Sequence, residues 1–248
     1  MKCHLCKQEK KLIKAHIIPS WCFKYLYDKK EKKRKPLIFA NLYSDSITHA
    51  GIYDKEILCE ECDSFLGDYD NYGKKVLLQT KIETLRKENN TFYLIKNINT
   101  HQLAIFFLSV LWRASISKRH EFSKVDIGPY KDKICFILNN VKNNQNFFTD
   151  LEKFPIVVRK FTGSNYSDLI DKNLQLPVFK RIDGINFYLL YFPKGFIIYI
   201  KVDKRNLPEF LKPFCLKGKT MLMLEKDFEN SEEFKFMVRA ITNKKSRK

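Results

Sequence analysis

The chain of 248 residues predicts an α+β fold with a small cysteine-stapled module at its N-terminus. Two Cys-x2-Cys pairs, CHLC and CEEC, frame the first quarter of the sequence. Apolar residues recur at helical spacing after the second pair, and strand-like segments separated by turns fill the C-terminal part. We therefore expect one module over residues 1–90, and a helical segment followed by an antiparallel β-sheet, arranged as a meander, over residues 91–248.

The cysteine pairs predict a structural zinc site. Zn²⁺ prefers four soft ligands in a tetrahedron, and a two-residue gap lets both thiolates of a pair reach one ion. Free core thiols or a redox pair are the alternative. The doubled spacing favours zinc, and the four ligands are Cys3, Cys6, Cys59 and Cys62.

The N-terminal module should contain short elements around a charged loop. Residues 10–16, KKLIKAH, suit a strand that ends at His16, and residues 20–27, SWCFKYLY, suit a short helix. The run DKKEKKRKP over residues 28–36 is typical of a solvated loop, and LIFANLY over residues 37–43 of a strand. Helical spacing of apolar residues predicts a helix over residues 62–77.

The remaining elements follow from periodicity and turn residues. Thr100 is placed to cap a helix over residues 101–118, and Gly128-Pro129 to open another through Asn140. Four β-rich segments then alternate with turn sequences such as Asp183-Gly184. Their sequences are FPIVVRKF, LPVFKRI, NFYLLYF and GFIIYIKV.

Composition favours a polyanionic partner. The formal net charge is +18, from 46 Lys and Arg against 28 Asp and Glu, which is typical of proteins that bind DNA or RNA. The codon bias of an AT-rich genome is the other explanation for this lysine content. The most apolar run is about ten residues long, against the roughly 20 that a transmembrane helix requires, so no membrane partner is expected. Free thiols favour a reducing, cytoplasmic setting.

A histidine and several carboxylates suggest phosphodiester hydrolysis. This reaction needs a base, a metal ion and positive charge for the substrate. His16 follows the first cysteine pair and is placed as the base. Asp63 and Asp70 lie seven residues apart, about two helical turns, so they share one helix face that could hold Mg²⁺ or Mn²⁺. Packing of His16 on the zinc loop, and plain solvation of the carboxylates, are the alternatives.

These motifs, in this order, resemble the HNH endonucleases with zinc knuckles. Within that group, the chain is similar to bacterial proteins that share AHIIP (15–19), GIYDKEILCEECD (51–63), LWRAS (111–115) and VDIGPY (125–130). The resemblance covers roughly residues 1–138 and implies a ββα-metal core, with a histidine base on the hairpin and a metal ligand on the following helix. Together, the resemblance and the patterns above give the expected fold class: a small zinc-stapled HNH-like ββα module, followed by helices and an antiparallel β-sheet.

Some positions depart from the family's pattern. Asp63 stands where a histidine commonly follows the second knuckle, and Ala15 precedes His16 where an acidic ligand is common. The middle asparagine has no clear equivalent, although Asn41 is a candidate, and His49 could approach His16 across the hairpin. Asp54 would then share the metal site with Asp63 and Asp70.

The preferred function is therefore metal-dependent cleavage of DNA, and two other classes stay open. One is a non-catalytic zinc-ribbon module that binds nucleic acid or a protein partner. The other is an effector that stays silent until a partner or signal arrives. Arg113 follows an apolar run and could anchor a phosphate or pair with an acid. The candidate phosphate-binding residues are Lys29, Lys30, Lys32, Lys33, Arg34, Lys35 and Arg113.

Overall fold

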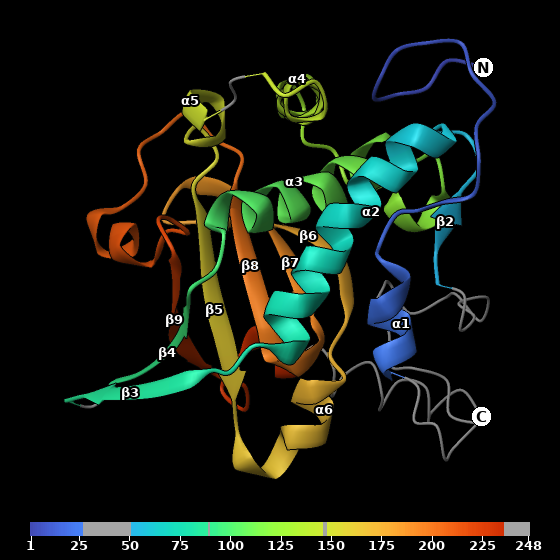
Figure 1. Ribbon diagram of the computed structural model, residues 1–248. Helices are drawn as coiled ribbons and strands as arrows, with labels where there is room; N and C mark the ends of the chain where they lie inside the picture. Colours follow the sequence, from blue (N-terminus) through green and yellow to red (C-terminus); the bar gives the residue numbers. More distant parts are fainter. Residues whose placement is uncertain (27–50, 89, 146–147, 236–248) are drawn as a thin grey trace, which may run out of the picture.

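The structure, a computed structural model, describes residues 1–26, 51–88, 90–145 and 148–235, and its fold class is α+β as expected (Figure 1). The described chain forms a short N-terminal hairpin, several helices and one large sheet. No helix within these ranges is long and apolar enough to cross a membrane. The charged run over residues 28–36, the expected strand at 37–43, Asn41 and His49 lie outside the described residues.

The N-terminal part follows a strand–strand–helix order. Strand β1 (Ala15–His16) pairs antiparallel with β2 (Tyr53–Asp54), with His16 opposite Tyr53. Helix α1 (Ser20–Leu26) follows β1, and helix α2 (Glu60–Lys74) follows β2. A π-helical turn, η1 (Lys75–Gln79), extends α2. The predicted helices at 20–27 and 62–77 are therefore confirmed to within a few residues.

The sheet has seven strands, which are antiparallel to their neighbours as expected except for one parallel pair, and the strand order differs from the expected meander. Its order is β3-β4-β9-β5-β8-β7-β6, and only β6, β7 and β8 form a consecutive antiparallel meander. Strand β5 lies beside β8 and pairs in parallel with β9. The strands are β3 (Glu83–Lys87), β4 (Asn90–Lys96), β5 (Ile156–Thr162), β6 (Gln175–Ile182), β7 (Ile185–Phe192), β8 (Phe196–Lys201) and β9 (Thr220–Asp227).

Both faces of the sheet are covered, so its central strands are apolar on both sides. Ile198 and Ile200 of β8 belong to the core beneath the helices, whereas Ile197 and Tyr199 belong to a second apolar cluster on the opposite face. The helical face is crossed by α3 (Thr100–Ile116), with α2 beside it (Figure 1). The second cluster includes Ile170 of α6 (Ser167–Asp171), and the 3₁₀ segment η5 (Glu209–Phe214) packs against it.

The expected boundary at residues 90 and 91 is not a break in the fold. Residue 90 is the first of β4, which pairs with β3, so the boundary falls inside a hairpin. The core beneath the helices is also continuous from Cys3 in the N-terminal loop to Met223 in β9. The N-terminal module and the sheet therefore share one apolar core.

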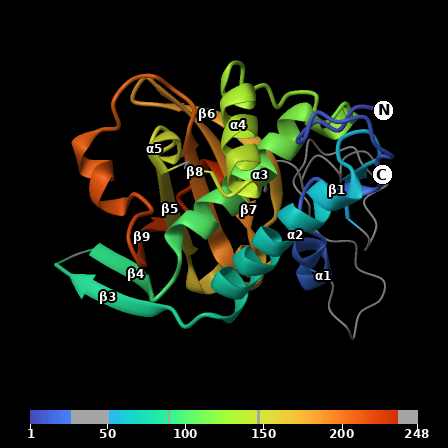
Figure 2. The ribbon, with the colours of Figure 1, turned by 45° about the horizontal axis from the view of Figure 1, so that its top comes forward.

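Helix α3 is the central helix of this core. Asn99, not Thr100, caps it, because the Asn99 side chain accepts a hydrogen bond from the backbone N–H of Gln102 at 3.0 Å. Helix α2 approaches α3 closely at Gly73, where a Cβ atom would lie 2.5 Å from the Phe106 ring. Helix α4 (Tyr130–Lys142), predicted from Gly128-Pro129, packs against α3 (Figure 2). These contacts pack both α2 and α4 against α3.

Short helical elements connect the longer ones. The 3₁₀ turn η2 (His120–Phe122) follows α3, and the short helix α5 (Phe148–Leu151) precedes β5. Two further short helical turns, η3 (Ser164–Tyr166) and η4 (Pro193–Gly195), adjoin α6 and β8 respectively. The η4 turn contains Lys194 with a φ of 65°, and its ammonium group donates to the Leu78 carbonyl at 2.8 Å. This bond ties the sheet to the end of η1.

Candidate functional site

The four predicted cysteines come together at the N-terminus of α2. Their sulfur atoms all lie within 4.8 Å of one another, and the Cys6 and Cys59 sulfurs are 3.9 Å apart. Four sulfurs at about 2.3 Å from a central zinc ion lie roughly 3.8 Å apart in a tetrahedron. The cluster therefore has the composition and size of a zinc site with four cysteine ligands.

Backbone hydrogen bonds join the two loops that carry the cluster. The Cys59 N–H donates to the Cys3 sulfur at 3.4 Å, and the neighbouring thiol of Cys62 lowers the pKa of Cys3. His4 N–H donates to the Ile57 carbonyl at 3.0 Å, which joins the two knuckle loops. His4 does not belong to the cluster of four sulfurs.

His16 lies on the hairpin that these loops support. Its side chain is partly exposed on β1, and its ring meets the Tyr53 ring edge-on with centroids 6.4 Å apart. The ammonium group of Lys14, which precedes β1, lies 5.4 Å from the centroid of the same Tyr53 ring. Lys14 therefore adds positive charge at the ring that His16 also meets.

Asp70 and Arg113 form a buried ion pair behind the hairpin. Arg113 donates to both carboxylate oxygens of Asp70, at 2.9 and 2.7 Å. The Arg113 side chain is 1% exposed and that of Asp70 is 13% exposed. The bidentate geometry fixes α2 against α3, and charged groups at such a site are stabilised only while both partners are present.

The end of α3 also holds both strands of the hairpin through their carbonyl groups. Arg113 donates to the His16 carbonyl at 2.8 Å, and Arg119 donates to the Tyr53 carbonyl at 3.2 Å. The Ser117 hydroxyl donates to Asp54 at 2.6 Å. The backbone that carries His16 is therefore held by residues at and just after the C-terminal end of α3, and by the cysteine cluster, whose first pair precedes it in the chain.

The structure changes the expectations for Arg113, Asp70 and Asp54. Arg113 is buried and paired with Asp70, so it is not a surface anchor for phosphate. Asp70 uses both oxygens on Arg113, and Asp54 uses its oxygens on Ser117 and on the Glu56 N–H, so both carboxylates have structural roles. The lysine-rich run over residues 28–36 lies outside the described residues.

Asp63 is the remaining candidate carboxylate. Its side chain is partly exposed in the first turn of α2 and makes no hydrogen bond or ion pair with the part of the chain that is described. Burial, the largest influence, and the nearby charge of Asp70 raise the pKa of Asp63, whereas Arg113 and His16 oppose this shift. The electrostatic effect of His16 on Asp63 places the two side chains in one neighbourhood.

The sequence analysis did not identify Lys14 and Arg119, the two basic residues that contact Tyr53 on the hairpin. Lys14 could have been found from its alternation with His16 on the predicted strand. Arg119 gave no such signal, because its partners, Glu121 and the Tyr53 carbonyl, are set by the chain path after α3.

Comparisons of this chain with protein families, curated proteins and solved structures found no match.

The buried ion pair can be tested directly. Arg113→Met is expected to lower the free energy of unfolding by about 3–5 kcal/mol, because Asp70 would stay buried without its partner. Urea unfolding monitored by circular dichroism measures this change. The double variant Arg113→Met/Asp70→Leu should recover most of the loss, since neither charge is left alone. A loss under about 1 kcal/mol for the single variant, typical of an exposed pair, would contradict the buried role.

Proposed function

We propose that this protein is a metal-dependent endonuclease that cleaves DNA, with His16 as its general base and Asp63 as a ligand of the divalent ion. The observation that carries the proposal is the placement of a partly exposed histidine on a hairpin held by a cysteine cluster and a buried arginine. The carboxylate of Asp63 lies nearby without a hydrogen-bonding partner among the described side chains. The strand–strand–helix order around the cluster supports the resemblance to HNH endonucleases.

The imidazole of His16 would take a proton from the attacking water. A base positioned in this way typically contributes about 10²–10⁴-fold to a hydrolysis rate. A general base must lie within hydrogen-bonding distance of the proton that it removes. The hydrogen bonds from Arg113 to the His16 carbonyl and from Arg119 to the Tyr53 carbonyl hold the hairpin, and so they help to keep the imidazole in place. The Tyr53 ring lies edge-on beside the imidazole.

Asp63 fits a divalent ion of the magnesium type. Mg²⁺ is usually held by one or two carboxylates, with waters and substrate phosphate filling the other positions. Asp63 supplies one hard oxygen donor, and no second group of three metal-ligating side chains exists in the described ranges. When bound, the ion would neutralise charge that develops on the phosphate.

The charge of the chain suits a nucleic-acid substrate. The net charge is +18, and Lys14 lies at the Tyr53 ring that His16 also meets. Lysine contacts to phosphates release counterions and raise affinity at low salt. Lys29, Lys30, Lys32, Lys33, Arg34 and Lys35 belong to the segment between β1 and β2 and remain predicted contributors to this surface.

A non-catalytic zinc module that binds nucleic acid is the second candidate. The observation that favours it is the commitment of Asp54 and Asp70 to structural contacts, which leaves Asp63 as the one free carboxylate of the three. Such a module would keep the zinc cluster and the basic surface without cleaving the substrate.

The Mg²⁺ concentration that the Asp63→Asn variant needs for DNA cleavage tests the proposed enzyme. The amide is a weaker ligand than the carboxylate, so we expect the Mg²⁺ concentration for half-maximal cleavage to rise about tenfold or more, a loss of roughly 1.4 kcal/mol of metal binding. Initial rates of plasmid nicking over a magnesium titration measure it.

Asp68→Asn is the matched control, because Asp68 is an exposed carboxylate on the same helix that lies outside the site. With DNA at saturating concentration, so that a change in DNA affinity does not alter the rate, its magnesium requirement should match that of the wild type. An unchanged magnesium requirement in Asp63→Asn would remove Asp63 from the metal site.

A further inference from the structure

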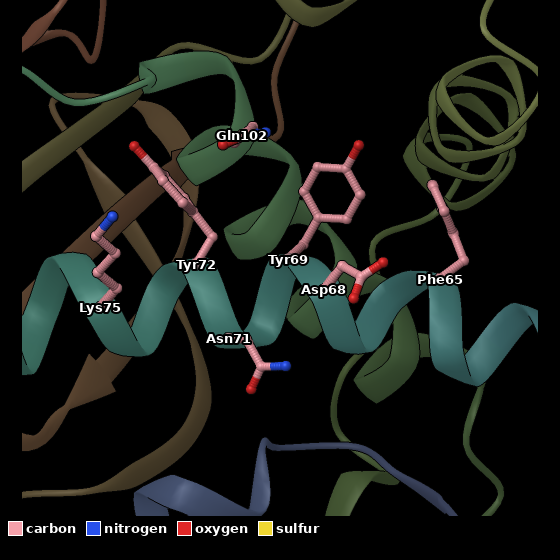
Figure 3. A pocket seen from close by; sticks show the side chains of 7 residues that line it. All are labelled: Phe65, Asp68, Tyr69, Asn71, Tyr72, Lys75 and Gln102. Atoms are coloured by element: carbon pink, nitrogen blue, oxygen red, sulfur yellow. The ribbon is translucent and has the colours of Figure 1, made fainter.

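A second surface feature lies on α2, away from the cysteine cluster. It is a groove of about 460 Å³ between α2 and the start of α3 (Figure 3). The side chains of Phe65, Tyr69 and Tyr72 rise from one side of α2 into it, and Gln102 of α3 faces them. The groove is lined by Phe65, Asp68, Tyr69, Asn71, Tyr72, Lys75 and Gln102.

The aromatic side chains form a row along the helix. Positions 65, 69 and 72 lie on one face, with a rise of about 6 Å and then 4.5 Å between successive residues. The rings of Phe65 and Tyr69 meet edge-on, with centroids 5.3 Å apart. Tyr72 is anchored, because its hydroxyl accepts from the Asn99 N–H at 2.6 Å. The row is only partly buried, so ring surface remains open to a ligand.

Polar groups around the row can bind a polar ligand. The ammonium group of Lys75 and the amide of Gln102 are both exposed at the groove. The Tyr69 hydroxyl makes no hydrogen bond within the described residues, and burial raises its pKa, so it keeps its proton and can donate. Aromatic faces beside an amide and a cation match a nucleobase and its phosphate, since bases stack on aromatic rings and ammonium groups bind phosphates.

We propose that this groove binds unpaired nucleotides of a single-stranded nucleic acid, with bases stacked on the row formed by Phe65, Tyr69 and Tyr72. A base in a duplex is stacked on both sides and cannot reach these rings. Lys75 contacts a phosphate of the bound strand. Asp68 at the margin of the groove repels phosphate and can accept a hydrogen bond from an amino group of a base, so it limits affinity without blocking the site.

The groove is separate from the nuclease site. Asp63 and Phe65 are two residues apart on α2, about 200° around the helix, so the two sites use opposite sides of the same helix. The inference rests on the proposed function only for the class of partner, nucleic acid. Binding in the groove requires neither His16 nor Asp63, so it can be measured while cleavage is switched off.

The experiment measures affinity by fluorescence anisotropy with a labelled single-stranded 20-mer and the matching duplex. All proteins carry His16→Ala, and neither Mg²⁺ nor Mn²⁺ is added. Tyr69→Leu keeps an apolar side chain and removes the ring, so we expect single-strand affinity to fall about 5- to 150-fold, which corresponds to roughly 1–3 kcal/mol for one stacked base. Duplex affinity should change less than twofold. Tyr69→Phe keeps the ring and removes only the hydroxyl, so it should lose clearly less single-strand affinity than Tyr69→Leu.

Several results would overturn the inference. Tyr69→Leu would contradict it by binding the single strand as tightly as the parent protein does, or by losing as much affinity for the duplex as for the single strand. Tyr69→Phe would contradict it by losing as much single-strand affinity as Tyr69→Leu. A free mononucleotide that competes as effectively as the unlabelled strand would also contradict it. Zinc content and circular dichroism establish that each variant is folded. If Tyr69→Leu does not fold, Phe65→Leu takes its place with the same expected outcome. Failure here leaves the cleavage proposal standing, because that proposal is tested by His16 and Asp63.

Discussion

His16→Ala is expected to lower the rate of DNA cleavage by about 10²–10⁴-fold. In the proposed mechanism the imidazole takes the proton of the attacking water, an interaction that is made in the transition state and contributes little to substrate binding. Affinity for DNA and zinc content should therefore stay near those of the wild type. The side chain is partly exposed and the neighbouring strand is held through its backbone, so the substitution should leave the hairpin folded.

Single-turnover rates with saturating enzyme measure this loss without interference from product release. The double variant His16→Ala/Asp63→Asn should be about as slow as the slower single variant, because base and metal activate the same water. If the two losses multiply, the side chains act on different steps. If His16→Ala cleaves as fast as the wild type, His16 is not the base.

Removal of zinc is expected to unfold the N-terminal hairpin and abolish cleavage. The strands that carry His16 and Tyr53 are two residues long each, far too short to be stable alone. Binding of a structural zinc ion contributes about 10–16 kcal/mol to comparable small sites at neutral pH, much more than the net stability of a typical domain. Cys62→Ser removes a buried ligand at the start of α2 and should act in the same way.

Thermal unfolding followed by circular dichroism, together with elemental analysis, tests this expectation. The wild type should contain close to one zinc per chain. Cys215→Ser is the matched control, since Cys215 lies outside the cluster, near the C-terminal end of η5, and should keep both zinc and cleavage. Less than half an equivalent of zinc in folded, reduced wild-type protein would rule out the zinc site.

Local patterns in the sequence predicted the local structure well. The cysteine spacing identified all four members of the cluster, because a Cys-x2-Cys turn depends only on neighbouring residues. The helices α1, α3 and α4 followed from apolar periodicity and turn residues for the same reason. The cap of α3 was placed one residue late, at Thr100 where the structure has Asn99, because both residue types can cap a helix.

Long-range pairing could not be predicted from these patterns. Asp70 and Arg113 are 43 residues apart, and each side chain alone was equally consistent with a functional surface role. The sheet order failed for a similar reason. Strand β9 pairs in parallel with β5 and in antiparallel with β4, and apolar content does not specify which strands become neighbours. The position of His16 after the first cysteine pair suggested it as the base, and the resemblance to HNH endonucleases added to that prediction.

The most direct measurement for the proposed enzyme is cleavage by the zinc-loaded wild-type protein with and without Mg²⁺ or Mn²⁺. Supercoiled plasmid, linear duplex and single-stranded DNA serve as substrates, with RNA alongside. The proposal predicts that nicks or breaks accumulate when the divalent ion is present and that they do not when it is omitted. No cleavage of any substrate by protein that carries its zinc and binds DNA would contradict the enzyme and favour the non-catalytic zinc module.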